Sequence, residues 1–174
     1  GSLAYGNRPK LTPYLGTDTH LPTVLSAFLT IYLVSFVSLS QRLQYERIII
    51  TGASSGFGKA FARTLASCTG ELVLVARNKE ALQQLAAELE EKHPGLRAAA
   101  LPCDLADESA LDNLAGRLLE LPAAKTLLIN NAGAGDYGEF SEGSWDRIRT
   151  LLRLNVESLT RLCHAMIPGL KRNG

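Results

Sequence analysis

The stretch that decides the fold reads Thr51-Gly52-Ala53-Ser54-Ser55-Gly56-Phe57-Gly58. It follows a short apolar run rich in isoleucine, residues 47–50, and precedes a stretch with the composition of a helix, residues 59–66. Gly52 permits a sharp exit from the strand, Gly56 lacks a side chain that would block a phosphate, and Gly58 lets the helix approach the sheet. The free N–H groups of the first helical turn would point at an anion. Strand, glycine turn and helix in this order therefore predict a pyrophosphate site.

From residue 47 onward, apolar runs alternate with patterns of helical period. The predicted strands span residues 47–51, 71–75, 97–101 and 126–130, and the predicted helices span residues 56–67, 79–92, 108–121 and 144–170. Such alternation is typical of βαβ units, in which a parallel sheet carries helices on both faces. The sequence therefore predicts a doubly wound α/β fold.

The second predicted strand ends in Val75-Ala76-Arg77-Asn78. A carboxylate at this strand end would hydrogen-bond a free ribose 2′-hydroxyl and would repel a 2′-phosphate. Here Arg77 offers instead a planar, permanently charged guanidinium that suits a phosphate. The sequence therefore favours NADP(H) over NAD(H), the alternative being that Arg77 is a solvated charge at a strand end.

A second motif, Asn130-Asn131-Ala132-Gly133, follows the fourth predicted strand. With the TGxxxGxG spacing of residues 51–58, it resembles the short-chain dehydrogenase/reductase family, and the resemblance runs from residue 47 to residue 174. The resemblance implies a Rossmann-type doubly wound parallel sheet, here incomplete with about four strands. It also implies an NADP(H)-dependent oxidoreductase that transfers hydride reversibly between the nicotinamide and a small carbonyl or alcohol substrate.

The resemblance assigns further residues to the cofactor. In the family, an Asp at the position of Asp104 contacts the adenine amino group, although Asp104 could equally cap the turn before the next helix. The Asn-Asn-Ala-Gly motif supports the sheet and borders the nicotinamide ribose in the family. We therefore expect the cofactor to be bound by Thr51, Gly52, Ser54, Ser55, Gly56, Phe57, Gly58, Arg77, Asn78, Asp104, Leu105, Asn131, Ala132 and Gly133.

Asn155 interrupts an apolar stripe on the last predicted helix. In the family, an Asn on this helix belongs to the catalytic tetrad and holds a water in a proton relay; the alternative is a structural Asn with satisfied hydrogen bonds. The other tetrad members, a Ser and a Tyr-x-x-x-Lys pair, lie C-terminal to this helix, and none of the five tyrosines of this chain has a Lys four residues later. We therefore expect residues 46–174 to be a truncated cofactor-binding half that is inactive alone. The alternative is a non-catalytic module that binds NADP(H) or pairs with a partner.

The N-terminal part differs in character. Residues 1–20 are irregular, with Pro and Gly breaking any pattern, and residues 21–40 carry no charge. Twenty helical residues cover roughly 30 Å, about the thickness of a bilayer core. A hydrophobic helix over residues 21–45 is therefore either a membrane anchor or an amphipathic helix packed on the domain or on a partner. As an anchor it would place the domain on the cytosolic side, since Arg42 and Arg47 follow it directly. Such a segment also resembles the membrane-associated lipid and steroid reductases of the family, which suggests a lipid-like substrate.

Composition excludes several classes of protein. The formal net charge of +1 gives no basic excess for nucleic acid. Cys68, Cys103 and Cys163 have no CxxC spacing and the three histidines form no ligand pattern, so we predict neither disulfides nor a metal site. The open edge of the fourth strand and the apolar face of the last helix should make the isolated fragment unstable or sticky. In the resembled family this helix commonly takes part in subunit pairing, so the resemblance implies a homo-oligomer in the full-length form.

Overall fold

The computed structural model describes residues 45–173. The hydrophobic stretch of residues 21–40 and the irregular residues 1–20 lie outside this range, so the prediction of an anchor there stays a prediction. Among the described residues, no helix is both long enough and apolar enough to cross a membrane.

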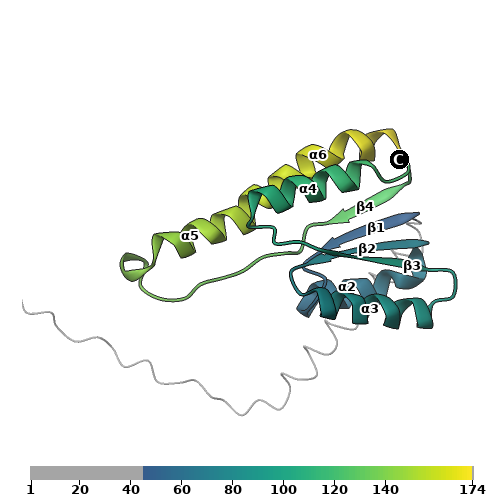
Figure 1. The fold of residues 1–174 in the computed structure, drawn as a ribbon, viewed down its shortest axis with the longest axis horizontal. Coiled ribbons are helices and arrows are strands. Elements are labelled where there is room, and N and C mark those ends of the chain that lie inside the picture. Colours follow the sequence, from purple (N-terminus) through teal and green to yellow (C-terminus); the bar gives the residue numbers. More distant parts are fainter. Residues whose placement is uncertain (1–44, 174) are drawn as a thin grey trace, which may run out of the picture. The chain divides into compact units, whose positions relative to one another are not determined.

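Four parallel strands form one sheet in the order β3-β2-β1-β4 (Figure 1). The strands are β1 (Arg47–Thr51), β2 (Glu71–Ala76), β3 (Arg97–Pro102) and β4 (Thr126–Ile129). The chain steps outward from β1 to β3 and then returns to the other side of β1 to form β4. The loops after β1 and β4 therefore leave neighbouring strands in opposite directions, and such a reversal opens a crevice at the carboxyl ends of the strands.

Helices cover both faces of the sheet. The helices α2 (Gly56–Leu65) and α3 (Lys79–Lys92) lie on one face, and α4 (Glu108–Leu119) and α6 (Ser158–Arg172) lie on the other (Figure 1). Short 3₁₀ turns span Ala66–Cys68 and Phe140–Glu142. The arrangement is the Rossmann-like α/β fold that the alternation predicted.

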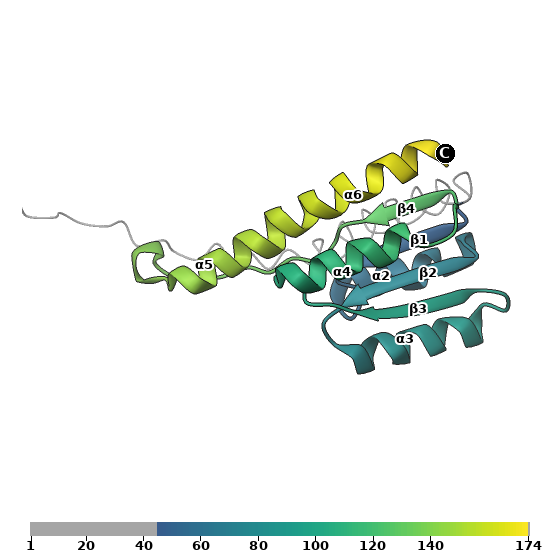
Figure 2. The ribbon, with the colours of Figure 1, turned by 45° about the horizontal axis from the view of Figure 1, so that its top comes forward.

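The predicted helix of residues 144–170 is not uniform. It begins as α5 (Trp145–Leu152), passes through a π-helical segment, Arg153–Glu157, and continues as α6. The helix is continuous through these segments, and α5 extends past the end of the sheet (Figure 2). A π turn accommodates one extra residue per turn and frequently occurs at functional sites.

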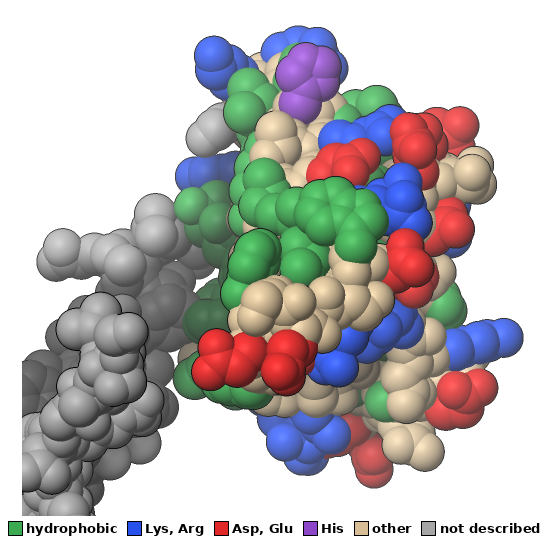
Figure 3. Space-filling view, turned by 90° about the vertical axis from the view of Figure 1, so that its left-hand side faces the viewer, with side chains coloured by type: hydrophobic (Ala, Val, Ile, Leu, Met, Phe, Trp, Pro, Cys, Tyr) green, Lys and Arg blue, Asp and Glu red, His purple; other side chains and the backbone are tan. Residues whose placement is uncertain are grey.

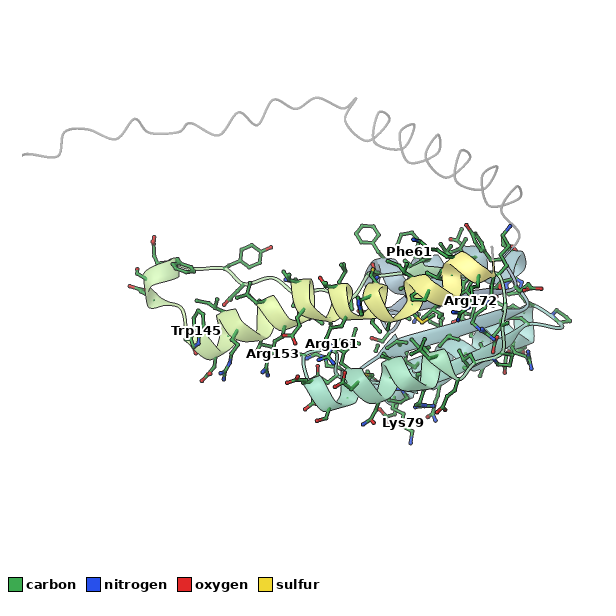
Figure 4. The ribbon with its side chains drawn as sticks, turned by 90° about the horizontal axis from the view of Figure 1, so that it is seen from above. Phe61, Lys79, Trp145, Arg153, Arg161 and Arg172 are labelled. Atoms are coloured by element: carbon green, nitrogen blue, oxygen red, sulfur yellow. The ribbon has the colours of Figure 1, made fainter. Side chains whose placement is uncertain are left out.

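The core lies on both sides of β1. Ile48, Ile49 and Ile50 have no exposed surface, which explains an apolar run without alternation, because a central parallel strand is buried on both faces. One core cluster joins Ile49 and Val73 to the apolar faces of α4 and α6, namely Leu111, Leu114, Leu118, Leu162 and Met166. Arg161 on α6 also pairs with Glu108 and Asp112 on α4 (Figure 4).

Two apolar surfaces stay open, as the sequence led us to expect. The strand β4 is half-buried, and no strand among residues 45–173 pairs with its outer edge. The helix that leaves the sheet exposes large hydrophobic side chains, and Figure 3 shows hydrophobic side chains gathered at that end of the domain. The exposed apolar residues of α5, the π segment and α6 are Trp145, Leu152, Val156, Leu159 and Ile167.

A buried ion pair joins the starts of β1 and β2. Arg47 Nε donates to Glu71 Oε2 at 2.7 Å, and Arg47 Nη1 donates to the carbonyl oxygen of Pro122 at 2.8 Å. The side chain of Arg47 is only 7% exposed. The guanidinium therefore ties β1 to β2 and to the segment that leads into β4.

We expect Glu71→Leu to lower the free energy of unfolding by about 3 kcal/mol, because it leaves a buried guanidinium without its counter-charge. The double variant Arg47→Met/Glu71→Leu should recover most of this loss, since it removes both charges. Urea unfolding followed by circular dichroism measures both. A single variant as stable as the unmodified chain would show that the pair contributes nothing.

Candidate functional site

A buried hydroxyl joins the ends of β1 and β4. Thr51 is 2% exposed, and its Oγ1 accepts hydrogen bonds from the backbone N–H groups of Asn131 at 2.9 Å and Ala132 at 3.0 Å. Asn131 Nδ2 donates in return to the carbonyl oxygen of Thr51 at 3.0 Å. We call these bonds the Thr51–Asn131 network. This network fixes the two loops that border the crevice, although Thr51 itself does not line the crevice.

The glycine turn packs directly against this network. Gly52 has φ +68°, and a Cβ there would lie 2.8 Å from Asn131 Nδ2. A Cβ on Gly58 would overlap the carbonyl oxygen of Gly52 and lie 2.6 Å from Asn131 Nδ2, so α2 touches the turn through bare backbone. A Cβ on Gly56 would meet nothing within 4 Å. Gly52 and Gly58 are thus required by packing, whereas Gly56 borders open space.

The N-terminus of α2 differs from those of α3 and α4. Asn78 Oδ1 accepts from the N–H of Ala81 at 2.8 Å to cap α3, and Asp107 Oδ1 accepts from the N–H of Ala110 at 2.7 Å to cap α4. Within the described residues, no side chain caps α2, and its first turn carries no acidic residue. The first turn of α2 therefore offers N–H groups and a positive dipole end to an anion.

A cleft of about 360 Å³ lies over the carboxyl ends of the strands. All the predicted cofactor residues line it except Thr51 and Gly58, which lie directly behind its wall. Three residues that the sequence reasoning missed also line it, Ala76, Cys103 and Leu154. Ala76 is the last residue of β2, and Cys103 directly follows β3. Their positions at the carboxyl ends of predicted strands could have identified them from the sequence. Leu154 belongs to the π segment, for which the sequence carries no signal.

Arg77 follows β2 and lines the cleft with an exposed side chain. No carboxylate in residues 45–173 forms an ion pair with it, so its charge is available to a ligand. Phe57, 80% exposed, also lines the cleft and belongs to the first turn of α2.

The side of the cleft after β3 carries one carboxylate, Asp104, and one thiol, Cys103. Asp104 Oδ1 accepts from the N–H of Ala106 at 3.0 Å and so closes a local turn, while the helix cap is Asp107. Burial raises the pKa of the Cys103 thiol to about 11, with the charges of Asp104 and Asp107 adding to the effect. The thiol is therefore protonated at neutral pH and is no nucleophile. Among the described residues, no cluster of His, Cys, Asp and Glu could hold a metal ion.

Asn155 lies in the π segment and does not line the cleft. Its Oδ1 accepts from the N–H of Ala134 at 3.0 Å, and its Nδ2 donates to the carbonyl oxygen of Ala134 at 2.7 Å. The amide is thus fully engaged with the loop that follows Gly133, although the residue is exposed rather than part of a buried stripe. Asn155 holds that loop, and a catalytic role for it stays a prediction.

These features define a class of protein, the Rossmann-like α/β proteins with a glycine turn at the reversal of strand order. The family model described as short chain dehydrogenase matches residues 46–174. The chain belongs to the short-chain dehydrogenase family.

Relatives and solved structures agree with this assignment. Over 140 residues the chain is 49% identical to sepiapterin reductase of Bos taurus, covering 71% of this chain and 52% of that protein. A short-chain dehydrogenase from Sphingobium yanoikuyae in complex with NADPH is 40% identical with a TM-score of 0.65, covering 70% of this chain and 47% of that one. L-sorbose reductase from Gluconobacter frateurii, complexed with NADPH and L-sorbose, is 30% identical with a TM-score of 0.68, covering 74% and 49%. The chain spans about half the length of these proteins.

We expect Gly58→Ala to lower the free energy of unfolding by about 3 kcal/mol, because the new methyl group meets backbone that cannot move aside. Gly116→Ala is the matched control in the middle of α4, where a Cβ would meet nothing within 4 Å. This control should gain about 0.5–1 kcal/mol from the better helix propensity of Ala. Urea unfolding compares them, and equal stabilities would contradict the close approach of α2 to the turn.

Proposed function

We propose that this chain is the NADP(H)-binding half of an oxidoreductase that transfers hydride reversibly between a nicotinamide and a carbonyl or alcohol substrate. Membership of the short-chain dehydrogenase family supports the reaction class. The cleft at the carboxyl edge of the sheet supports a dinucleotide site, because it combines a glycine turn, an uncapped helix start and an unpaired arginine.

Arg77 is the residue that favours NADP(H) over NAD(H) in this proposal. Its guanidinium lines the cleft one residue after β2 and pairs with no carboxylate among residues 45–173, so it can donate two charge-assisted hydrogen bonds to a phosphate. The NADPH held by the Sphingobium yanoikuyae enzyme supports the same choice by similarity.

Each part of the cleft has a distinct task in this proposal. The first turn of α2 and the glycine turn bind the pyrophosphate, Arg77 and Asn78 bind the phosphorylated ribose, and Asp104 with Leu105 borders the adenine. Asn131, Ala132 and Gly133 border the nicotinamide ribose. The bound cofactor supplies the hydride, and the protein holds and orients it. Asn155 orients the loop after Gly133 through its two bonds to Ala134.

The assignments of substrate and assembly rest on the resemblance, and the membrane attachment rests on the uncharged stretch of residues 21–40 with Arg42 and Arg47 after it. We propose a small, lipid-like carbonyl or alcohol as the substrate of the whole protein, a homo-oligomer as its assembly, and a cytosol-facing domain attached to a membrane through residues 21–40. The exposed apolar face of α5 and α6 supports association.

The chain should bind NADPH about tenfold to hundredfold more tightly than NADH, since charge-assisted hydrogen bonds to the 2′-phosphate contribute about 1.5–3 kcal/mol. Arg77→Asp should abolish or reverse this preference. Arg153→Asp makes the same charge change on an exposed side chain outside the cleft and should leave the preference intact. Isothermal titration calorimetry measures the affinity of the unmodified chain and of the two variants for both nucleotides. Equal affinity of the unmodified chain for NADPH and NADH would defeat the assignment of Arg77.

Residues 1–174 alone should bind NADPH without reducing ketones, because no Tyr-x-x-x-Lys pair occurs in them to transfer the alcohol proton. The loss of NADPH absorbance over a panel of ketones measures this. Sustained turnover by a chromatographically pure sample would mean that other groups of this chain move the proton.

A further inference from the structure

The amino ends of the strands form the edge of the sheet opposite the cleft. Two hollows, of about 750 Å³ and 150 Å³, open at this edge, and they adjoin because Asn173 lines both. The C-terminal end of α6 lies at the same edge (Figure 1). We call this region the amino-edge surface, and its central residues are Tyr45, Pro122, Ala123, Lys125, Arg172 and Asn173.

The amino-edge surface carries positive charge. Lys125 and Arg172 have exposed side chains, and neither forms an ion pair within residues 45–173. Arg47 also lines the smaller hollow but is buried in its ion pair. Among the described lining residues, the one carboxylate is that of Glu46, whose Oε2 accepts from the backbone N–H of Lys125 at 2.7 Å. Lys171, beside Arg172 in the chain, adds a further exposed cation.

Apolar groups lie beside these charges. The segment that leads into β4 exposes Pro122 and Ala123, and Leu119 at the end of α4 is 56% exposed. The ammonium group of Lys125 lies 5.7 Å from the ring centre of Tyr45, and tyrosine is a residue type that is enriched at the level of lipid head groups. Cations around small apolar projections are typical of a surface that rests on anionic lipid.

The length of the connecting chain brings this edge close to a bilayer. Tyr45 follows the uncharged stretch of residues 21–40 by five residues, and five extended residues span at most about 18 Å. With residues 21–40 in a membrane, as proposed above, Tyr45 is held within about 18 Å of the bilayer. The cleft lies at the other end of β1, which spans about 17 Å.

We propose that the amino-edge surface binds the head groups of an anionic lipid bilayer, with Lys125, Lys171 and Arg172 beside the phosphates and Pro122 and Ala123 among the head groups. The inference rests on the membrane attachment in the proposed function. The cleft then faces the aqueous side, from which a dinucleotide can enter.

Lipids with a nitroxide on the head group test the proposal, because they quench tryptophan emission at short range. The full chain is added to vesicles of phosphatidylcholine and phosphatidylglycerol that contain this lipid. Trp145, the sole tryptophan, lies at the opposite end of the last helix from Arg172 (Figure 4) and should not be quenched. In the variant Ala123→Trp/Trp145→Phe, the sole tryptophan lies on the amino-edge surface and should lose most of its emission.

Charge variants in the Ala123→Trp/Trp145→Phe background test the origin of the contact. Adding Lys125→Glu/Arg172→Glu should abolish the quenching, since each cation near an anionic surface raises the affinity roughly fivefold. Adding Lys79→Glu/Arg153→Glu instead reverses as many exposed charges away from this edge and should leave the quenching unchanged. Added salt screens the same attraction without any charge substitution and should also reduce the quenching.

Four outcomes would overturn the proposal. The first is equal quenching at position 123 in vesicles without phosphatidylglycerol, and the second is an equal response to the two charge variants. The third is quenching that disappears as the ratio of protein to lipid rises, which would show that a second copy covers the surface. The fourth is a chain that floats with the vesicles but is not quenched at position 123, which leaves the membrane attachment intact. A chain that does not float with the vesicles would contradict both the attachment and the inference.

Discussion

The Thr51–Asn131 network is the interaction on which the site depends. A single buried hydroxyl accepts two backbone N–H groups of the loop after β4, and the Asn131 amide returns to the loop after β1. These bonds hold together two loops that leave the sheet in opposite directions. They also fix the atoms against which Gly52 and Gly58 pack, so the start of α2 is positioned by the same network. Loss of the hydroxyl would therefore disturb the crevice as a whole.

Most of the fold could be predicted because the sequence alternates so regularly. The four strands match the predicted ranges within one residue, and the glycine turn and Asn-Asn-Ala-Gly motif lie beside each other at the edge of the sheet, as expected.

Three details could not be predicted. Asp104 and Asp107 are both suited to a cap, and only the start of α4 decides between them. The π segment has no signal in the sequence, and the bonds of its Asn155 to Ala134 join residues far apart in the chain. The exposed apolar stripe has the same period as a buried one, so periodicity could not show where the helix leaves the sheet.

The last helix serves two purposes along its length. Its second half, α6, buries Leu162 and Met166 against the core, whereas its first half, α5, extends past the sheet and forms one wall of a second cavity, whose other wall is the loop of residues 136–143. The π segment lies where the two halves meet, and it contributes Leu154 to the cleft and Asn155 to the cavity. A change of helical geometry at this point thus lets one element border both spaces.

The central claim is that the cleft at the carboxyl edge of the sheet binds NADP(H). The most direct test is a titration of the ¹⁵N-labelled chain with NADPH, followed by amide chemical shifts. The account predicts the largest shifts at the glycine turn, at Arg77 and Asn78, and at Asn131 to Gly133, with little change at the amino ends of the strands. Absence of shifts at the glycine turn at saturating NADPH, or shifts confined to the loop of residues 136–143, would contradict it.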